Sequence, residues 1–481
     1  MRETKHVHLI GICGTAMASL AGMLQAQGHR VTGSDAAAYP PMSDQLAEMH
    51  IPVMQPYSEA NLTPRPDMVV VGNAISRGNP ELEYVLDQRV CFVSMAALIH
   101  DEFLQEREPL VVCGTHGKTT TTSMLAWIYE VASRTMPELA ASFLIGGVAE
   151  NFGTSFLVRL ETKPFILEGD EYDTAFFDKG PKFLHYFPDA AILTHVEYDH
   201  ADIYADLEAV KTAFKRLVNL VPRRGRIVAF DGSANVTECV ARAFCAVERY
   251  GFEPSSYWQM KDFKGGASTK WTLLREGKHF ADLELPMAGE HNALNATAAA
   301  AMAAGQGVPA VAIVEALASF RSVKRRLEVR AEVNGITIID DFAHHPTAIR
   351  ETLRALRSAY PDRRLIAVLE PRSNTLRRNV FEADLIDSLS GANEVALASV
   401  FKSEAIPTTE RLEPQRVVAG LTQIGIPAQL YSDADAIVTG LTPRLLPGDV
   451  VAILSNGGFG DIYTKLPRAI AAQNSEAENG E

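Results

Sequence analysis

The sequence predicts an α/β protein of three domains, each built on a mostly parallel β-sheet. Its 481 residues are about three times the usual domain length of roughly 150 residues, so one core is too few. Short apolar runs recur along the whole chain, and an amphipathic stretch of helical length follows each. Strands that alternate with helices are typical of parallel sheets, because a crossover helix returns the chain to the starting edge.

The first two domains are expected over residues 1–107 and 108–326. HVHLIGI and DMVVVG are the clearest strands of the first domain, and the charged stretch HDEFLQEREP after them is typical of a connector. The second domain contains the strands PLVVCG, PFILEGDE, DAAILTH and GRIVAF. Within it, apolar and polar residues alternate over residues 257–286, which predicts a small antiparallel meander.

The third domain is expected over residues 327–481. Its predicted strands are GITIIDD, RRLIAVLE, NEVALASV and DVVAILSNGG. The basic cluster VKRRLEVR lies across the boundary with the second domain, and we expect it to act as a hinge.

Composition excludes several classes of protein. A formal net charge of −14 disfavours a broad nucleic-acid surface but still allows local phosphate binding. The chain has no run of about 18 apolar residues and no signal-like start, so we expect a cytoplasmic protein with no membrane contact. Its five cysteines form no CxxC pair, which argues against structural zinc and a disulfide framework. Nothing indicates an obligate protein partner, and a monomer is expected.

The strongest motif is VVCGTHGKTTTTSMLAWIYEVA, in which a strand enters a glycine-rich turn and then a helix. Backbone N–H groups of such a turn bind phosphate, and Lys118 would add a fixed charge for the β- and γ-phosphates. A hydroxyl of Thr119 or Thr120 would ligate Mg²⁺. The alternative is a plain glycine turn before a surface helix. The residues expected around the triphosphate are Gly114, Thr115, His116, Gly117, Lys118, Thr119 and Thr120.

Two acidic clusters follow later strands of the second domain. Carboxylates with a neutral imidazole suit Mg²⁺ that bridges a nucleotide and a substrate oxygen, and the carboxyl ends of parallel strands are where ligands bind. Taken alone, each cluster is equally explained as a solvated acidic surface. The two sets are Glu168, Asp170, Glu171 and Asp173 in FILEGDEYD, and Glu197, Asp199, His200 and Asp202 in HVEYDHADIY.

The N-terminal segment HLIGICGTAMASLAGMLQAQGHRVTGSD imitates a dinucleotide-binding fingerprint. Cys13 and Met17 stand where that fingerprint has its second and third glycines. We therefore expect a phosphate or ribose of a nucleotide-linked substrate near Gly11, Gly14 and Asp35. A purely structural turn is the alternative.

Polar residues after strands of the third domain, and one segment of the second, form further candidate sites. In DDFAHHPT of the third domain, the carboxylates of Asp340 and Asp341 could hydrogen-bond a ribose, and His344 and His345 could approach phosphate; the alternative is a helix-capping acid and a solvated histidine pair. In GEHNALNATAA of the second domain, the amide of Asn292 or Asn295 could pair with an adenine edge or cap its helix. Two more loops follow strands, and Arg372 could hold a carboxylate or form a surface ion pair. Their residues are Arg372, Ser373, Asn374 and Thr375, and Ser455, Asn456, Gly457 and Gly458.

Together these motifs resemble the Mur ligase family of ATP-dependent amide-forming enzymes. GTHGKTT, EGDEYD, EYDH, GEHNALNATAA, RRLE and DDFAHHPT occur in the family order across about 350 residues, and GICGT to GSD extends the match to nearly the whole chain. The resemblance implies a Rossmann-like N-terminal domain, a P-loop ATPase-like central domain and a Rossmann-like C-terminal domain.

The resemblance also implies roles for individual residues. Lys118, Glu168 and His200 would be catalytic, and Mg²⁺ would be held by Thr119, Thr120, Glu168 and His200. Arg326 would reach the nucleotide from the hinge, beside Asn292, Asp341 and His344. UDP-N-acetylmuramate would bind Gly11, Gly14, Asp35 and Asn73, and the incoming peptide Arg372, Asn374, Ser455 and Asn456. Several relatives carry a carbamylated lysine; the counted position here is Phe214, flanked by Lys211 and Lys215.

Within the family, two activities compete. GICGTAM, GSDAAAYPPMS, VGNAISRGNPELEYVL, LEPRSNTLRR and LSNGGFGDI resemble the branch that attaches recycled L-alanyl-γ-D-glutamyl-meso-diaminopimelate to UDP-N-acetylmuramate, in peptidoglycan recycling. The alternative is the ligase that adds L-alanine to the same sugar nucleotide during cell-wall synthesis. From other classes, a nicotinamide-dependent dehydrogenase leaves GTHGKTT unused, and a regulatory nucleotide-binding protein needs neither the acidic clusters nor a third domain.

Overall fold

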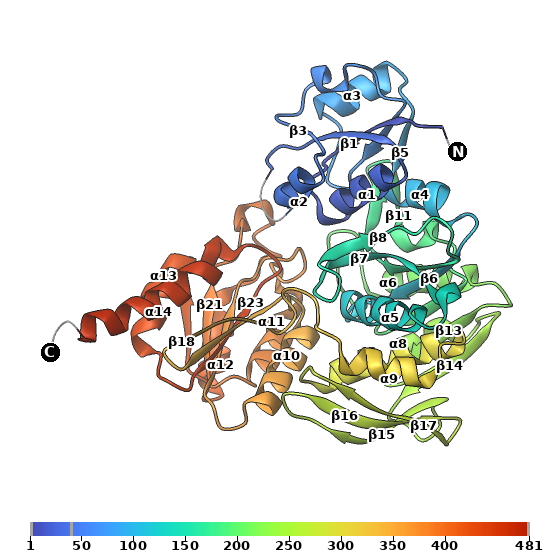
Figure 1. Cartoon of the computed structure of the whole chain (residues 1–481). Helices are drawn as coiled ribbons and strands as arrows, with labels where there is room; N and C mark the ends of the chain where they lie inside the picture. The colour runs from blue at the N-terminus through green and yellow to red at the C-terminus, as the bar shows by residue number, and fades with distance from the viewer. Residues whose placement is uncertain (1–2, 39–41, 479–481) are drawn as a thin grey trace.

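The computed structural model describes residues 3–38 and 42–478, and it contains three sheet-and-helix bodies in chain order (Figure 1). The blue N-terminal body has a five-stranded sheet, the cyan-to-yellow central body a ten-stranded sheet, and the orange-to-red C-terminal body a six-stranded sheet. Most neighbouring strands are parallel, which confirms the predicted α/β class. Over the described ranges, no helix is both long enough and apolar enough to cross a bilayer.

The N-terminal sheet is wholly parallel, in the order β3-β2-β1-β4-β5. Its strands are rich in Val, as expected of short strands that are covered on both faces. Its strands are β1 (His6–Ile10), β2 (Arg30–Ser34), β3 (Val53–Met54), β4 (Met68–Val71) and β5 (Phe92–Ser94), and its helices α1 (Thr15–Ala26), α2 (Met42–Glu48), α3 (Pro80–Asp87) and α4 (Met95–Ile99).

The central sheet has the order β17-β16-β15-β14-β13-β12-β6-β9-β7-β8. One face carries α5, α8 and α9, and α6 and α7 belong to the core on the opposite face. A separate β10–β11 hairpin follows β9. The bounds are β6 (Glu108–Cys113), β7 (Ser142–Ala149), β8 (Thr154–Leu157), β9 (Pro164–Gly169), β10 (Asp173–Ala175), β11 (Asp178–Pro181), β12 (Ala190–Leu193), β13 (Arg226–Phe230), β14 (Ala246–Gly251), α5 (Lys118–Ser133), α6 (Leu207–Leu220), α7 (Ala234–Val240), α8 (Glu290–Gly305) and α9 (Ala310–Ala318).

The predicted meander is confirmed as the antiparallel strands β15 (Trp258–Lys264), β16 (Thr269–Arg275) and β17 (Lys278–Leu285). It is not an isolated unit, because β15 pairs in parallel with β14 and so extends the central sheet. Buried Trp258 and Trp271 anchor it to the core beneath α8 and α9.

The C-terminal sheet has the order β18-β19-β23-β20-β21-β22, and all its pairs except β18–β19 are parallel. Its strands are β18 (Glu328–Val333), β19 (Ile336–Asp341), β20 (Leu365–Leu369), β21 (Glu394–Ala398), β22 (Ala428–Tyr431) and β23 (Val450–Leu454), and its helices α10 (Pro346–Ala359), α11 (Glu382–Leu389), α12 (Pro414–Gln423), α13 (Ala434–Leu441) and α14 (Ile462–Glu478).

The N-terminal body packs on the central body through α1. The hydroxyls of Ser19 and Ser155 are 2.8 Å apart, and both are fully buried. Gly22 faces the ring of Phe156, where an added Cβ would collide with the ring. The two bodies therefore share one apolar core, which continues from β1 and α1 to α6 and α7.

The C-terminal body meets the central body at the carboxyl ends of their strands. The Thr375 hydroxyl, in the loop after β20, donates to Oδ1 of Asp199 at 2.6 Å. Nε2 of His345, at the start of α10, is 3.2 Å from the carbonyl of Tyr198. The polar residues predicted from both bodies therefore lie in one region.

Candidate active site

The turn between β6 and α5 has the backbone that a phosphate loop needs. Gly114 and Gly117 have φ values of +136° and +79°, a region that favours glycine. A Cβ on Gly114 would collide with the Thr194 hydroxyl, and one on Gly117 would lie 2.5 Å from Oδ1 of Asn295. No side chain caps α5, whose first turn begins at Lys118, so its N-terminal N–H groups point to the loop.

Lys118 folds back over this loop. Its Nζ donates to the carbonyl of Gly114 at 2.8 Å and to Oε1 and Oε2 of Glu171 at 3.0 and 2.8 Å. Burial disfavours the charged ammonium, but the carboxylates of Glu171, Asp170 and Glu168 outweigh it and raise the pKa of Lys118. The lysine is therefore a fixed cation at the mouth of the loop.

Glu168, at the end of β9, connects the phosphate loop with β7. The Thr119 hydroxyl donates to its Oε1 at 3.1 Å, and the N–H of Gly146 donates to its Oε2 at 2.9 Å. Burial raises the pKa of Glu168, although the charge of Lys118 opposes that shift. Nη2 of Arg326 is 3.4 Å from the Thr119 hydroxyl, so the hinge reaches the same point.

Asp170, Glu171 and His200 form an acidic cluster beside Lys118. One ligand atom from each lies within 4.8 Å of the others. Nε2 of His200 is 3.2 Å from Oε1 of Glu171; burial opposes its protonation, but Glu171 raises the pKa of His200 to about 9. Two carboxylates and one imidazole are a donor set that can hold a divalent cation. Of the predicted Mg²⁺ ligands, this group contains His200, whereas Glu168 and Thr119 contact each other instead. The residues that gather here therefore fit a divalent cation next to the phosphate loop.

Asp341 and His344 lie in the C-terminal body, at the end of β19 and in the segment that follows it. Asp341, at the end of β19, is buried and accepts from the N–H groups of Leu327 and Ala343 at 2.8 and 2.9 Å. Burial raises its pKa. Nδ1 of His344 is 2.8 Å from the carbonyl of Phe342, and burial lowers the pKa of His344.

The predicted adenine-contacting residue Asn292 lies in the first turn of α8. Its amide is buried and donates at 2.8 Å to the carbonyl of Ala288, in the segment just before the helix. A cavity of about 320 Å³ lies nearby, between the end of the meander and the hinge. Its lining includes Met287, Val323 and Arg326.

Among the predicted peptide-binding residues, Arg372 lies over the ring of Phe401, 3.8 Å from its centroid. Its Nη1 is 3.4 Å from Oε1 of Glu370. The hydroxyl of Ser455 is fully buried and donates to Oε2 of Glu370 at 2.5 Å. Glu370 therefore links the loops that follow β20 and β23.

Of the two predicted peptide-binding asparagines, Asn374 is hydrogen-bonded to the central body, whereas the side-chain oxygen of Asn456 has no partner among the described residues. Nδ2 of Asn374 donates to Oδ2 of Asp202 at 2.8 Å, and the Tyr172 hydroxyl donates to the same carboxylate. These contacts join the C-terminal body to both acidic segments of the central body. Oδ1 of Asn456 is buried and, among the described residues, accepts no hydrogen bond.

The N-terminal candidates gather where β1 ends. Gly11 has a φ of +83°, and Gly14 immediately precedes α1. Asp35, after β2, accepts from the N–H groups of Cys13 and Ala36 at 2.9 and 2.8 Å. The acid predicted to bind a ribose therefore also fixes the glycine turn.

Asn73 faces the central body instead. Its Nδ2 donates to the carbonyl of Asp173 in the β10–β11 hairpin at 2.7 Å. Beside this contact, the rings of Phe92 and Phe177 meet edge to face at 5.2 Å between centroids. Asn73 thus lies at the junction of the first two bodies, just after β4, the strand that neighbours β1.

Sequence reasoning missed two side chains that organise the site. Lys182 donates to Oδ2 of Asp170 at 2.6 Å. Arg325 donates to Asp340 at 3.1 Å and to the carbonyls of Ser455 and Gly457. Lys182 carried no motif signal, whereas the basic cluster at the hinge gave no means of separating Arg325 from its neighbour. Thr375, which the sequence placed in the candidate loop after β20, fixes Asp199.

The position counted for a carbamylated lysine is occupied by a packed aromatic ring. Phe214 is fully buried, with its ring centroid 5.3 Å from that of Phe183. Lys211 and Lys215 both donate to Glu238 at 2.6 Å. Both flanking ammonium groups are therefore in ion pairs that join α6 to α7.

Comparison with known proteins identifies the family. Three family models match: the Mur ligase family, catalytic domain, over residues 6–106; the Mur ligase middle domain over residues 112–303; and the Mur ligase, glutamate ligase domain, over residues 325–457.

Individual relatives cover almost the whole chain. The UDP-N-acetylmuramate–L-alanyl-γ-D-glutamyl-meso-2,6-diaminoheptandioate ligase of Escherichia coli (strain K12) is 41% identical over 477 residues, 98% of this chain and 100% of that protein. A crystal structure of a murein peptide ligase from Psychrobacter arcticus has a TM-score of 0.73 and 36% identity, covering 97% of this chain and 99% of its own. A UDP-N-acetylmuramate–alanine ligase from Thermotoga maritima has a TM-score of 0.78 over 98% of this chain and 100% of its own; at 22% identity it shows the shared fold alone. On these matches, the chain belongs to the Mur ligase family, as its motifs predicted.

Proposed function

We propose that this chain uses ATP to join L-alanyl-γ-D-glutamyl-meso-diaminopimelate to UDP-N-acetylmuramate, as in peptidoglycan recycling. The observation that carries the proposal is Lys118, which stands between the phosphate loop and the cluster of Asp170, Glu171 and His200. The names of the relatives that match almost the full chain supply the substrates.

The proposed reaction has two steps. The carboxylate of UDP-N-acetylmuramate attacks the γ-phosphorus of ATP, which forms an acyl phosphate and releases ADP. The amine of the peptide then attacks the acyl carbon, forms the amide bond and releases phosphate. Both steps need positioning and charge neutralisation rather than a protein nucleophile, and this agrees with a site of glycines, one lysine and carboxylates.

The residues of the central body would hold the triphosphate. The turn amides would bind its oxygens, and Lys118 would neutralise charge on the β- and γ-phosphates. Thr119, Thr120, Glu168 and His200 would hold Mg²⁺, which, when bound, supplies positive charge beside the phosphate and substrate oxygens. Asp341 and His344 would face the ribose and phosphates, and Asn292 and Arg326 the nucleoside, for which the neighbouring cavity offers about 320 Å³.

The outer bodies would bind the two molecules to be joined. Gly11, Gly14, Asp35 and Asn73 lie at the carboxyl edge of the N-terminal sheet, and we assign them to UDP-N-acetylmuramate. Across the site, the loops after β20 and β23 would bind the peptide. Their assigned residues are Arg372, Asn374, Ser455 and Asn456.

We further propose domain boundaries at residues 107 and 326, which are supported by the start of β6 at Glu108 and of β18 at Glu328.

We place the reaction in the cytoplasm, since it consumes ATP and the five cysteines are free thiols. We expect the chain to act as a monomer, with residues of one chain supplying every part of the site.

The assay that tests this function offers two acceptor amines separately. Full-length protein receives ATP, Mg²⁺ and UDP-N-acetylmuramate, together with either L-alanine or the tripeptide, and both ADP and the coupled product are measured. We expect turnover with the tripeptide. Turnover with L-alanine alone would instead assign the cell-wall synthesis activity, and an absence of ADP with either amine would refute the ligase.

A further inference from the structure

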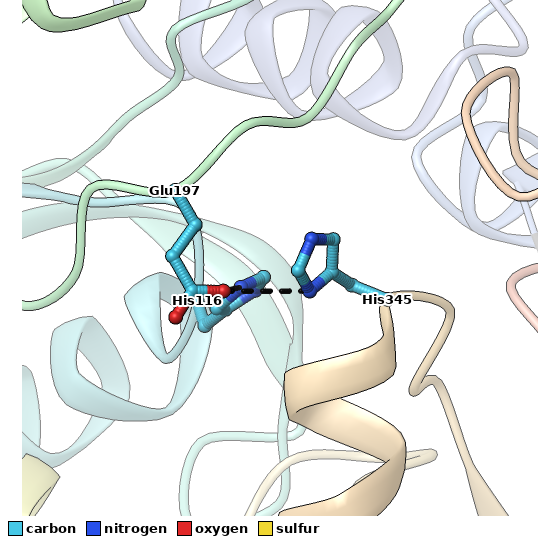
Figure 2. Close-up of side chains that lie close together, drawn as sticks. All are labelled: His116, Glu197 and His345. Carbon is cyan, nitrogen blue, oxygen red and sulfur yellow. Dashed lines mark hydrogen bonds and ion pairs between the residues drawn. The ribbon is translucent and has the colours of Figure 1, made fainter. Parts of the chain in front are cut away.

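A second group of metal-binding side chains lies between the phosphate loop and the C-terminal body (Figure 2). It consists of His116 from the loop, Glu197 from the segment after β12, and His345 at the start of α10. One ligand atom from each lies within 4.8 Å of the others. In Figure 2, the His345 ring extends from the helix toward the Glu197 carboxylate and the His116 ring.

The spacing of these atoms suits a common coordination sphere. Nε2 of His116 is 2.9 Å from Oε2 of Glu197, and Nδ1 of His345 is 3.5 Å from the same oxygen. In a tetrahedral site with metal–ligand bonds of about 2.0–2.2 Å, ligand atoms lie about 3.4 Å apart. Small shifts of the three side chains would therefore bring these atoms to the distances of a metal coordination sphere.

Hydrogen bonds around the group prepare His345 to act as a ligand. Its Nε2 is 3.2 Å from the carbonyl of Tyr198 and donates to it, which makes Nδ1, 3.5 Å from Oε2 of Glu197, the unprotonated nitrogen. A backbone carbonyl is a usual partner for the second nitrogen of a metal-bound histidine. The only protein donor to Nδ1 within the described ranges is the N–H of Thr347, at a long 3.3 Å. Burial lowers the pKa of His345 to about 3, so its ring is neutral at neutral pH.

Glu197 is likewise held in place as an anion. The Thr347 hydroxyl donates to its Oε2 at 2.7 Å. Burial opposes ionisation, but the hydrogen bond and charge of His116 lower the pKa of Glu197 to about 2. The side chains of His116, Glu197 and His345 are 14%, 30% and 6% exposed, so the group is enclosed but remains open to solvent through Glu197.

We propose that His116, Glu197 and His345 form a binding site for a divalent transition metal of the Zn²⁺ class. Two imidazole nitrogens and one carboxylate favour Zn²⁺ or Co²⁺ over Mg²⁺, which prefers oxygen ligands in an octahedron. This site is separate from the cluster of Asp170, Glu171 and His200, and it does not depend on the proposed reaction.

A metal in this site would link three segments that are distant in sequence. It would tie the start of α10 to the phosphate loop two residues before Lys118, and so hold the C-terminal body against the central body. We expect Zn²⁺ to stabilise the folded chain and to slow any turnover that requires the loop or the C-terminal body to move.

Cobalt provides a direct test, because tetrahedral Co²⁺ bound by nitrogen and oxygen absorbs visible light strongly. The full-length protein is titrated with Co²⁺ in excess Mg²⁺, which competes with Co²⁺ for the acidic cluster of Asp170, Glu171 and His200. We expect visible bands in the unmodified protein, displaced by Zn²⁺ and lost in His345→Gln and in Glu197→Gln. Thr347→Val, which removes the donor to Glu197, is expected to weaken Co²⁺ binding about 10-fold.

Matched variants separate this site from other metal ligands. His279→Gln alters an exposed histidine on β17, and His200→Gln alters the acidic cluster; both should keep the bands. Zn²⁺ should raise the thermal unfolding midpoint of the unmodified protein but not that of Glu197→Gln, whose position is more exposed than His345 and tolerates change better. Bands that are absent from the unmodified protein, survive both ligand variants, or disappear in His200→Gln would overturn the proposal.

Discussion

At the scale of single residues, the contacts of Lys118 connect the structure with phosphate binding. Its ammonium is bonded to a loop carbonyl and to Glu171, and Glu171 also contacts His200. Burial works against the charged form of Glu171, but Lys118 and His200 lower its pKa. A triphosphate that takes Lys118 as a partner therefore leaves Glu171 with His200 as a second cationic neighbour, and the carboxylate stays neutralised.

We expect Lys118→Ala to reduce ADP formation by at least about 100-fold, because it removes a fixed charge from the reacting phosphate. The measurement is ADP release with UDP-N-acetylmuramate and peptide at saturation. Lys465→Ala, which removes a lysine from an exposed ion pair with Asp435, is the matched control and should keep full turnover. Near-normal turnover of Lys118→Ala, with circular dichroism unchanged, would contradict the assignment of the loop.

We expect Arg372→Ala to raise the KM for the peptide about 10- to 100-fold, because a charge-assisted pair with a carboxylate is lost. The KM for ATP should change little, since Arg372 lies in the loop after β20. Steady-state kinetics with each substrate varied in turn measure both values. Arg354→Ala, on the exposed side of α10, serves as the control. Equal increases for both substrates would show that Arg372 has no selective role toward the peptide.

At the scale of elements, local patterns predicted what lies near in sequence. The strand, turn and helix around Lys118 are as predicted. This was possible because the two glycines of the turn and the first apolar residues of the helix lie within a few residues of one another in the sequence. The meander over 257–286 was predicted by alternation, but its parallel pairing with β14 was not. Likewise the parallel pairing of β12 with β6 joins segments far apart in the sequence, which no local pattern specifies. The contact of Lys182 with Asp170 depends on the β10–β11 hairpin between them, which no motif predicted.

We expect Gly117→Ala to weaken nucleotide binding about 10-fold or more. The new methyl group would be strained at a φ of +79° and would press against the side chain of Asn295, which distorts the turn amides. Binding of a fluorescent ATP analogue measures the effect. Gly277→Ala is the matched control, since Gly277 has a φ of +73° but nothing within 4 Å of its added Cβ. Equal losses in both variants would indicate general strain rather than a disturbed loop.

At the scale of the whole molecule, the fold class and the family were predictable, and the packing of the bodies was not. Motif order across most of the chain identified the family. The buried pair of Ser19 and Ser155 and the fit of Gly22 against Phe156 join α1 to β8 without any signal in either segment. The site candidates on different bodies could therefore be assigned to sheet edges from sequence, but their contacts, such as Asn374 with Asp202, could not.

We expect the chain to lose stability on acidification because of three enclosed histidines. Burial lowers the pKa of His195 and His291 to about 4 and that of His345 to about 3, from 6.5 in a free side chain. Below pH 6.5 the unfolded chain binds protons that the folded chain does not, so stability falls as the pH drops from about 6.5 to about 4. Each histidine would cost roughly 2 kcal/mol at about pH 5.

Thermal unfolding at about pH 7.5 and about pH 5 measures this loss. His195→Gln should show a smaller drop in midpoint between the two conditions than the unmodified chain. His50→Gln, at the exposed end of α2, should show the full drop. If the unfolding midpoint of the unmodified chain does not change with pH over this window, the three histidines do not destabilise the folded chain at low pH.

The hinge has one further property. Arg325 is fastened to the C-terminal body by Asp340, two backbone carbonyls and the hydroxyl of Tyr463, whereas the side chain of Arg326 reaches Thr119 on α5. We therefore expect any swivel between the two bodies to turn about an axis close to the peptide bond that joins these two arginines. The contact of Arg326 with Thr119 and the loop after β23, which Arg325 holds, would then move little, while the parts of the C-terminal body far from this bond would swing through a wide arc.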